Sequence, residues 1–197
     1  MDGDDTELIE RFHSALKILE GCGEFKWLIP EVRSNLVYAR EDPKSVDDIL
    51  AVDGRITVVD DRPYAAGKPR FGASSHMARL ILEVRKTDPS IRAGLNFANN
   101  PEFSRFLKQY CGEKGWVFSV MDRSSEPEEV KEREEGSMPW KVAQAIKAAD
   151  GKVPKVFYET GAVGKEPVTV LIGQDPVEVV NEVCVIAREY NPGEWVR

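Results

Sequence analysis

Short β-rich segments alternate with amphipathic helical segments along the whole chain, and this alternation limits the fold more than any other feature of the sequence. Residues 7–20, for example, carry apolar side chains at Leu8, Phe12, Leu16 and Leu19, which is the period of a helix. Strands that interleave with helices favour an α/β domain in which helices pack on a sheet. Further helices are expected over 44–52, 75–87, 100–112, 138–149 and 175–190, and strands over 55–60, 91–98, 116–121, 155–159 and 167–173.

The chain is expected to form one domain over residues 1–197. It contains no internal repeat, no low-complexity tract and no Gly/Ser-rich linker. A chain of this length can bury about 70% of the surface of its unfolded state. The strands expected at 155–159 and 167–173 are joined by a connection short enough for antiparallel pairing. A mixed sheet is therefore favoured over a purely parallel one.

Charge and hydropathy exclude several classes of protein. The chain has 27 Lys and Arg against 34 Asp and Glu, a net charge of −7, so a dedicated nucleic-acid binder is not expected. No apolar run approaches the ~20 residues of a membrane span, and the acidic start is unlike a secretory signal. The three cysteines are far apart and never in C-x-x-C spacing, so neither a zinc ribbon nor a disulfide framework is expected. Two of them lie in apolar stretches, where a buried free thiol is expected. We expect a cytoplasmic protein with no nucleic-acid or membrane partner, and a homo-oligomer is compatible with the sequence.

The segment RFGASSHMARLIL, residues 70–82, is the strongest candidate for a binding site. Its apolar spacing starts a helix near Ser75, with Ser74 or Ser75 as the N-cap, so His76 falls in the first turn. Free backbone N–H groups and the positive end of the helix dipole meet there, which suits a phosphate or pyrophosphate. Gly72 would let an oxyanion approach the backbone, and the two serine hydroxyls would add donors. An ordinary capped helix with a surface histidine is the alternative, and the spacing leaves it open.

The same position bears on the protonation of His76. The positive end of a helix disfavours an imidazolium, so an empty site would hold a neutral imidazole. That form donates a hydrogen bond from one ring nitrogen and accepts one at the other. A bound polyanion would act in the opposite direction and favour the cation.

Four charged residues stand where strands begin or end. Arg55 follows a glycine at the start of a strand, where a guanidinium can bind phosphate oxygens through two hydrogen bonds, and Arg70 is a similar candidate. Asp122 and Arg123 directly follow a buried strand, at a position where α/β sheets collect ligand-binding groups. Asp122 is the candidate for magnesium or for a hydrogen bond to substrate. Exposed surface arginines and a turn-forming aspartate are the alternatives.

The glycine-rich loop GAVGKEP, residues 161–167, shares only part of the P-loop pattern. Two residues rather than four separate Gly161 from Gly164, and Glu166 stands where a P-loop carries Ser or Thr for magnesium. Gly164, Lys165 and Glu166 are candidate phosphate contacts, with an ordinary turn between two strands as the alternative.

Several catalytic classes find no support in the sequence. The two histidines form neither an H-x-H nor an H-E-x-x-H pair, so a histidine-rich metal site is not expected. Neither a G-x-S-x-G nucleophile motif nor a G-x-G-x-x-G after a strand is present. No organic cofactor is therefore expected.

Six stretches in order resemble the ThiN-type thiamine-phosphate synthase family, and together they span nearly the whole chain. The resemblance implies a three-layer α/β/α fold with a mixed central sheet, similar to class II aldolase (AraD)-like proteins. The chain lacks the histidine cluster of those metal aldolases, so a sugar-phosphate lyase activity is not carried over with the fold. The stretches are IPEVRSNLVYAR (29–40), DGRI (53–56), RFGASSHMAR (70–79), IRAGLNFANN (91–100), MDRSSEP (121–127) and YETGAVGKEPVTVLIGQDPVEV (158–179).

The resemblance also implies a reaction and its residues. The family joins a hydroxymethylpyrimidine pyrophosphate to a hydroxyethylthiazole phosphate and releases pyrophosphate, so the expected partners are small phosphorylated pyrimidine and thiazole substrates, with Mg²⁺. Arg55 and His76 match an arginine and a histidine that the catalytic members carry, and Asn96 falls in a matching stretch. The alternative is a non-catalytic domain that senses thiamine phosphate in a regulatory system. The presence of Arg55 and His76 favours the enzyme.

Overall fold

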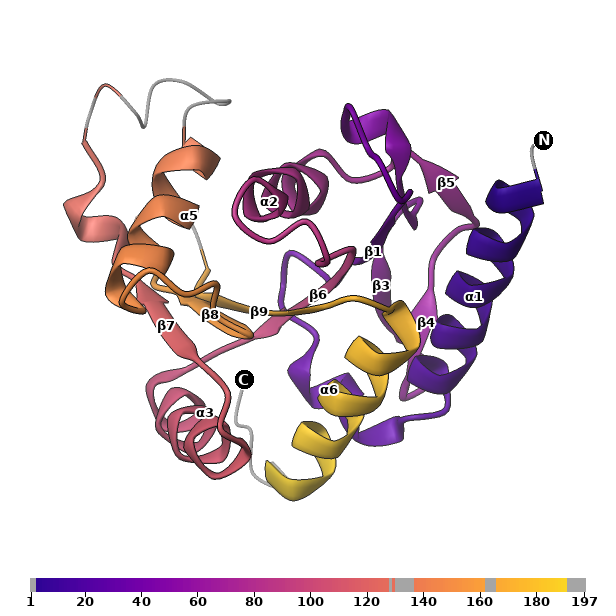
Figure 1. Ribbon diagram of the computed structural model, residues 1–197. Helices are drawn as coiled ribbons and strands as arrows, with labels where there is room; N and C mark the ends of the chain where they lie inside the picture. Colours follow the sequence, from indigo (N-terminus) through magenta and orange to yellow (C-terminus); the bar gives the residue numbers. More distant parts are fainter. Residues whose placement is uncertain (1–2, 128, 130–136, 162–165, 191–197) are drawn as a thin grey trace.

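The computed structural model describes residues 3–127, 129, 137–161 and 166–190. Its centre is a seven-stranded sheet with the strand order β5-β2-β1-β6-β9-β8-β7, and β3 and β4 form a separate hairpin (Figure 1). The strands are β1 (Leu36–Ala39), β2 (Ile49–Val52), β3 (Ile56–Val59), β4 (Arg62–Ala65), β5 (Pro69–Phe71), β6 (Ala93–Ala98), β7 (Phe118–Met121), β8 (Val156–Glu159) and β9 (Val168–Gly173). The α-helices are α1 (Gly3–Glu20), α2 (Ser75–Arg85), α3 (Pro101–Lys114), α5 (Ser137–Ala148) and α6 (Pro176–Tyr190), and the 3₁₀ turns are η1 (Gly23–Leu28), η2 (Val46–Asp48) and η3 (Arg123–Ser125).

The helices cover both faces of the sheet. α2 and α5 pack against each other on one face, whereas α1, α3 and α6 lie on the other (Figure 1). Alternate residues of a strand point to opposite faces, so Leu171 of β9 belongs to the core beneath α6. Its neighbours Val170 and Ile172 belong to the core beneath α2. Burial on both faces explains why the central strands have continuous apolar sequences rather than alternating ones.

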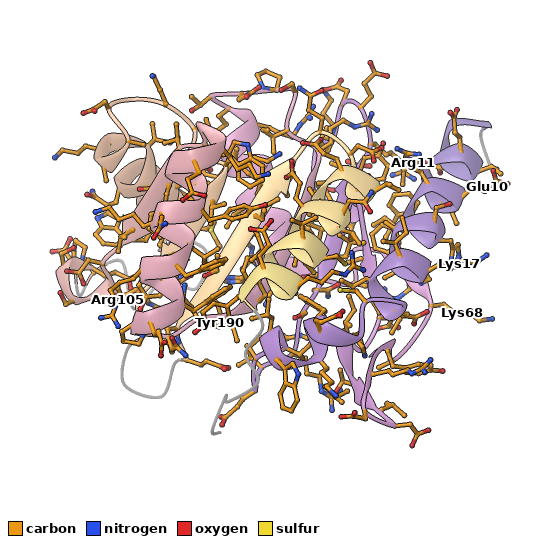
Figure 2. The ribbon with its side chains drawn as sticks, turned by 90° about the horizontal axis from the view of Figure 1, so that it is seen from below. Glu10, Arg11, Lys17, Lys68, Arg105 and Tyr190 are labelled. Carbon is orange, nitrogen blue, oxygen red and sulfur yellow. The ribbon has the colours of Figure 1, made fainter. Side chains whose placement is uncertain are left out.

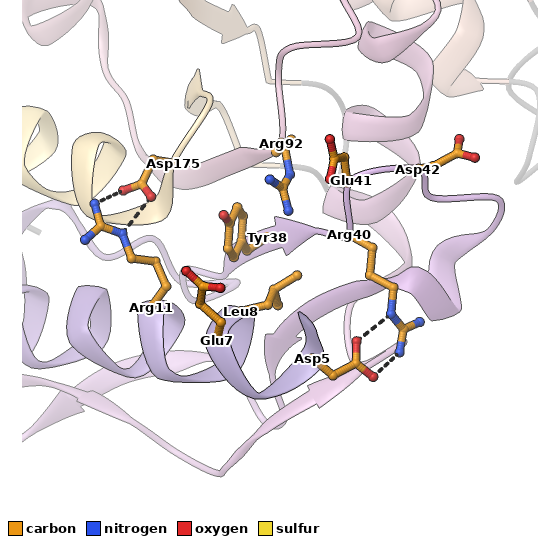
Figure 3. A pocket seen from close by; sticks show the side chains of 10 residues that line it. All are labelled: Asp5, Glu7, Leu8, Arg11, Tyr38, Arg40, Glu41, Asp42, Arg92 and Asp175. Atoms are coloured by element: carbon orange, nitrogen blue, oxygen red, sulfur yellow. Dashed lines mark hydrogen bonds and ion pairs between the residues drawn. The ribbon is translucent and has the colours of Figure 1, made fainter. Parts of the chain in front are cut away.

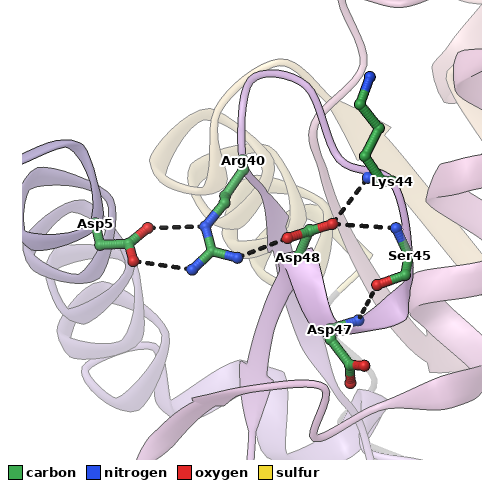
Figure 4. Close-up of polar contacts among 6 residues, drawn as sticks. All are labelled: Asp5, Arg40, Lys44, Ser45, Asp47 and Asp48. Atoms are coloured by element: carbon green, nitrogen blue, oxygen red, sulfur yellow. Dashed lines mark hydrogen bonds and ion pairs between the residues drawn. The ribbon is translucent and has the colours of Figure 1, made fainter. Parts of the chain in front are cut away.

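Ion pairs attach α1 to the rest of the domain. Charged residues such as Glu10 and Lys17 lie on the outer side of this helix (Figure 2). At its first turn, the guanidinium of Arg40 donates to both oxygens of Asp5, each at 2.8 Å, and to Asp48 at 2.7 Å (Figure 4). Arg40 directly follows β1, so this contact connects the helix to a central strand of the sheet.

All pairs in the large sheet are antiparallel except β7 with β8. The antiparallel pairing of β8 with β9 confirms the mixed sheet expected from the sequence. The directions of the strands bring several chain segments to one edge of the sheet. The ends of β2, β6, β7 and β8 meet there with the starts of β1 and β9.

Most predicted helices are confirmed, with small changes at their ends. α2 begins at Ser75 as expected and ends at Arg85, and α3 begins at Pro101 after the predicted cap. The cap is a real hydrogen bond, since Asn100 Oδ1 accepts from the N–H of Phe103 at 2.8 Å.

The helix expected over 44–52 is wrong beyond its first turn. Ser45 and Asp48 do form the predicted capping box, with the Ser45 hydroxyl accepting from the N–H of Asp47 at 3.2 Å. This box starts only the short turn η2, and residues Ile49–Val52 continue as the fully buried strand β2. Burial of four consecutive apolar residues in the centre of a sheet outweighed the local helix signal.

The strand expected over 55–60 is also shorter, because it turns back on itself. Asp60 and Asp61 adopt positive φ angles of 48° and 63°, and the chain returns as β4. Aspartate tolerates this left-handed conformation better than most residues, which suits a tight hairpin turn. Sequence patterning did not identify β1, β4 or β5 as strands.

Two expectations about the whole chain can be compared with the described residues. Cys22, Cys111 and Cys184 are all free and buried, whereas the sequence favoured burial for two of the three. Among the described residues, none of the helices combines the length and the apolar character that crossing a bilayer requires.

Gly72 is required by the fold at the turn between β5 and α2. Its φ is +72°, and a Cβ at this position would lie 2.6 Å from Asp47 Oδ1. We therefore expect Gly72→Ala to lower the free energy of unfolding by about 1–3 kcal/mol, measured by urea denaturation. Gly112→Ala in α3 is the matched control, because a Cβ there meets nothing within 4 Å. The control should stabilise the protein by about 0.5–1 kcal/mol, and equal effects of the two changes would contradict this account.

Candidate functional site

A cavity of about 280 Å³ opens at the sheet edge where β6, β7 and β8 end and α2 begins. Its lining combines cations, amides and a histidine with an apolar patch, which is typical of a site for a small molecule. The lining residues are Val32, Arg33, Asn35, Arg55, Ser74, His76, Met77, Asn96, Arg123, Glu159, Glu166, Val168 and Val170.

The structure brings together about half of the site residues predicted from the sequence. Arg55, His76, Ser74, Asn96, Arg123 and Glu166 all line this one cavity, although they come from five separate segments. Arg70, Gly72, Ser75 and Asp122 are not among its lining residues. Gly164 and Lys165 lie outside the described residues.

The first turn of α2 forms one wall. Ser74 is the N-cap with an extended backbone, but its side chain makes no capping hydrogen bond and lies at the cavity instead. The first N–H groups of a helix have no partner within the helix, and here the cap hydroxyl does not satisfy them. The helix start is therefore both a cap and an open donor site, as expected for a position that receives an anion.

His76 lies in this first turn and is accessible from the cavity. Although it is exposed, protein atoms surround the concave site, and this desolvation lowers the pKa of His76 below its usual 6.5. Glu159 raises that pKa, whereas the positive charges of Lys141, Arg123 and Arg55 lower it further. The lowered pKa favours the neutral imidazole at neutral pH, in agreement with the position of His76 at a helix start.

Arg33 and Arg55 lie on neighbouring loops, and the side chain of each donates a hydrogen bond to the backbone of the other's loop. Arg33 and Arg55 both adopt left-handed conformations, with φ of 67° and 70°. The Arg33 guanidinium donates to the carbonyl of Gly54 at 3.3 Å, and the Arg55 guanidinium donates to the carbonyl of Val32. A positive φ is unfavourable for a residue with a Cβ, and such strain concentrates at functional sites. Arg33 was not predicted as a site residue, because no local sequence pattern distinguishes it from a surface arginine.

Glu166 holds the same loop from the opposite side. Its carboxylate accepts from the N–H groups of Glu31 at 2.9 Å and Val32 at 3.1 Å. The sequence suggested Glu166 as a phosphate contact. In the structure it fixes the loop that carries Arg33, and its negative charge is stabilised by backbone donors.

Two buried asparagines continue the sheet beyond its regular ladder. Asn96 Oδ1 accepts from the N–H of Asn35 at 2.7 Å, and its amide donates to the carbonyl of Arg33 at 3.2 Å. The Asn35 side chain in turn pairs with both backbone groups of Val52, at 3.0 and 3.3 Å. These amides replace the missing strand hydrogen bonds, so the loop bearing Arg33 is fixed to β6 and β2. Asn96 was predicted as a site residue, and Asn35 was not.

Arg123 and Glu159 line the cavity and belong to a cluster of buried charges behind it. Glu159 Oε1 is 2.7 Å from Arg123 Nη1 and 2.6 Å from Lys141 Nζ. Glu126 lies 3.7 Å from Arg123 Nε and accepts from the hydroxyl of Ser137 at 2.5 Å. Arg123 was predicted, but Lys141 and Glu159 were missed. The signal for Lys141 was its place on the apolar stripe of α5, where Met138, Val142 and Ala145 are also buried.

The remaining predicted residues make other contacts. Arg70 is exposed on β5 and pairs with Asp53 at 3.3 Å. Asp122 is exposed and caps η3 by accepting from the N–H of Ser124 at 2.9 Å. Hydrogen bonds from the side chain and the backbone N–H of Ser124 lower the pKa of Asp122. The N–H of Gly72 donates to the carbonyl of Ile49 at 3.0 Å and is thus occupied. Within the described residues, no group of three or more His, Cys, Asp or Glu side chains is arranged to hold a metal ion.

A larger cavity of about 550 Å³ opens at the opposite edge of the sheet (Figure 3). Two of its three arginines form ion pairs with carboxylates of the same cavity. Arg11 donates to both oxygens of Asp175, at 2.7 and 2.9 Å, and Arg40 binds Asp5. Tyr38 lies between these pairs, with Arg92 over its ring at 4.8 Å (Figure 3). Since these contacts hold α1 to the sheet, we take the smaller cavity as the candidate site.

Comparison with known proteins gives one consistent result. The family model described as thiamine-phosphate synthase ThiN matches residues 11–185. Thiamine-phosphate synthase ThiN of Methanothermobacter thermautotrophicus is 42% identical over 182 residues, which cover 92% of this chain and 93% of that protein. The bifunctional thiamine biosynthesis protein ThiDN of Methanocaldococcus jannaschii is 36% identical over 167 residues, covering 83% of this chain and 37% of that protein. The crystal structure of the C-terminal domain of phosphomethylpyrimidine kinase superposes with a TM-score of 0.87 and 33% identity, covering 92% of this chain and 99% of that one.

The neutral state of His76 gives a direct test of the site. We expect its pKa, measured by NMR titration, to lie below 6.5 in the free protein and to rise when pyrophosphate is saturating, since an anion stabilises the imidazolium. A His76→Gln variant assigns the signal, because the chain has only two histidines. An unchanged pKa with pyrophosphate bound would show that the anion lies elsewhere.

Proposed function

The chain belongs to the ThiN family of thiamine-phosphate synthases. We propose that it catalyses the reaction of this family in the cavity lined by Arg55 and His76. Hydroxymethylpyrimidine pyrophosphate and hydroxyethylthiazole phosphate are the substrates, and thiamine phosphate and pyrophosphate are the products. The observation that carries the proposal is the meeting of Arg55, His76 and Arg123 with the start of α2 around one cavity. This arrangement supplies several donors to an anion, which a pyrophosphate leaving group requires.

The reaction transfers the pyrimidinylmethyl group from a pyrophosphate oxygen to the thiazole nitrogen. The bond between the pyrimidine methylene carbon and the bridging oxygen breaks, and its electron pair leaves with the pyrophosphate. The thiazole nitrogen attacks the same carbon, and the new C–N bond makes the ring a thiazolium. Negative charge develops on the departing oxygen, so a positive and preorganised environment lowers the barrier.

The described residues divide this work among them. Arg55 is assigned to the pyrophosphate, where a guanidinium can bind two oxygens at once. The lowered pKa of His76 favours the neutral imidazole in the free protein, and this form donates a hydrogen bond to the phosphate. Once a bound polyanion has raised that pKa and the ring has taken up a proton, the imidazolium can pass the proton to the phosphate as charge develops. The cap hydroxyl of Ser74 and the first N–H groups of α2 add neutral donors.

An apolar patch of the same cavity suits the aromatic rings. Val32, Met77, Val168 and Val170 line the cavity beside the charged groups. An apolar wall excludes water from a reactive methylene carbon and strengthens the nearby electrostatic contacts. The pairing of an apolar wall with a cationic wall therefore matches substrates that carry a ring at one end and phosphate at the other.

Magnesium is part of the proposal as a companion of the pyrophosphate. The described residues offer it no ready-made cluster of ligands, and the Asp122 carboxylate is bound to a backbone N–H. Mg²⁺ is often held by one or two carboxylates together with substrate phosphates, and it would neutralise charge on the leaving group. None of the residue roles above depends on it.

The finer fold assignment is likewise proposed. Helices on both faces of a mixed sheet support a three-layer arrangement of the class II aldolase (AraD)-like kind. We propose that residues 1–197 form one such domain.

The proposed reaction has a simple test. Purified protein mixed with the two phosphorylated precursors and Mg²⁺ is expected to produce thiamine phosphate and pyrophosphate in equal amounts, measured by chromatography. Absence of turnover, together with tight binding of thiamine phosphate, would instead indicate a sensor domain.

Substitutions at the two residues that match the catalytic members test their roles. Arg55→Ala and His76→Ala are each expected to lower the turnover rate at least about tenfold, the lower part of the range for positioned electrostatic or acid–base groups. Arg62→Ala is the control, since Arg62 is exposed on the β3–β4 hairpin and does not line the cavity. Wild-type rates in the two cavity variants would refute the assignment.

A further inference from the structure

The buried charges beside the cavity need an explanation that stability does not provide. The side chains of Arg123, Lys141 and Glu159 are 8%, 4% and 5% exposed. Removing such groups from water costs free energy that their mutual attraction recovers only with good geometry, and apolar residues often serve stability equally well. A buried ionic cluster in the wall of a cavity is therefore a sign of function.

The fold fixes this cluster from three directions. Arg123 follows β7 and Glu159 ends β8, and the parallel pairing of these strands brings the two residues to the same edge. The N–H of Arg123 donates to the hydroxyl of Thr160 at 3.0 Å, which holds the backbone beside the end of β8. Lys141 reaches Glu159 from α5.

The contacts within the cluster leave Arg123 only partly satisfied. Both cations approach the same oxygen, Glu159 Oε1. Arg123 Nε is buried without a hydrogen-bond partner in the described part of the chain, and the nearest oxygen of Glu126 is 3.7 Å away. A buried donor without an acceptor is rare, and it indicates a guanidinium with bonding capacity left for an incoming acceptor.

We propose that Lys141 and Glu159 are positioning residues that hold the guanidinium of Arg123 at the cavity wall, where it binds a phosphate or pyrophosphate anion. Glu159 fixes the orientation of Arg123. Lys141 also binds Glu159 Oε1, so Arg123 does not hold this carboxylate alone. Buried Glu126 adds a second negative charge, but it lies 3.7 Å from Arg123 Nε, beyond hydrogen-bond distance, so Arg123 keeps donor capacity for the ligand. The identification of this anion with a substrate group rests on the proposed function.

Lys141 and Glu159 also affect the pKa of His76. Glu159 faces it from β8, Lys141 from α5, Arg123 from η3 and Arg55 from the connection between β2 and β3. Arg33 and Glu166 line the same cavity. Glu159 and Lys141 have opposite effects on the imidazolium, so removing one charge or the other should shift His76 in opposite directions.

The first experiment measures that shift by NMR titration without any substrate. We expect Lys141→Met to raise the pKa of His76 and Glu159→Gln to lower it. The double variant, which removes one charge of each sign, should return the pKa toward the wild-type value. It also keeps the test valid if a single variant with an unpaired buried charge does not fold. Shifts in the same direction, or none, would overturn the electrostatic role.

The second experiment measures the binding of inorganic pyrophosphate by calorimetry. We expect Arg123→Gln to weaken binding at least about tenfold, the loss of one charge-assisted contact, and Lys141→Met to weaken it in the same direction. Lys147→Met is the matched control, because Lys147 lies on the same helix but is exposed, and its affinity should equal that of the wild type. Wild-type affinity in Arg123→Gln would overturn the proposal.

These measurements separate this inference from the proposed function. Loss of pyrophosphate binding in Arg123→Gln without any synthase turnover in the wild type would support the anion site and refute the enzyme. Synthase turnover in the wild type, together with unchanged pyrophosphate binding in Arg123→Gln, would support the enzyme and refute the anion site at Arg123. In an active enzyme, the Glu159→Gln variant should lower kcat more than it changes KM, since it displaces a group that acts on the leaving pyrophosphate.

Discussion

The parallel pairing of β7 with β8 is the constraint on which the site depends. In a sheet that is otherwise antiparallel, this one pair sends two strands in the same direction to the same edge. Arg123 and Glu159 follow from it as neighbours, and the connection through α5 brings Lys141 against them. An antiparallel pair would have placed the ends of the two strands at opposite edges, and the charged cluster would not exist.

A second constraint is the set of bonds that fixes the loops opposite this cluster. Asn35 and Asn96 bind backbone groups where regular strand pairing ends, and the Glu166 carboxylate holds the loop that precedes Arg33. These contacts fix the loop that carries Arg33 in its left-handed conformation, and the Arg55 side chain binds the same loop at the carbonyl of Val32. Most of the polar residues around the cavity thus hold other residues in place, and fewer are left to contact a ligand.

The extent to which the sequence predicts this structure follows the range of the interactions. Signals carried by neighbouring residues were reliable: the Asn100 cap of α3, the start of α2 at Ser75 and the placement of His76 in its first turn. Features set by tertiary burial were not, and Ile49–Val52 became a strand despite a correct helix-capping signal at Ser45. Lys141, Glu159 and Arg33 were missed for the same reason. A lysine on an apolar helix stripe or a glutamate at a strand end acquires meaning only when the sheet brings it beside its partner.

The two cavities show why the smaller one is the better anion site in a chain with a net charge of −7. In the larger cavity, Arg11 and Arg40 bind carboxylates, so their positive charges are already neutralised. In the smaller one, Arg33 and Arg55 donate to backbone carbonyls, which use their hydrogen-bonding capacity without cancelling their charge. An incoming phosphate can replace a neutral carbonyl at much lower cost than it can replace a carboxylate. Arg123 also lines the smaller cavity and does bind a carboxylate, but it shares that carboxylate with Lys141, because both cations approach Glu159 Oε1. The partners of the arginines therefore favour the smaller cavity as the anion site.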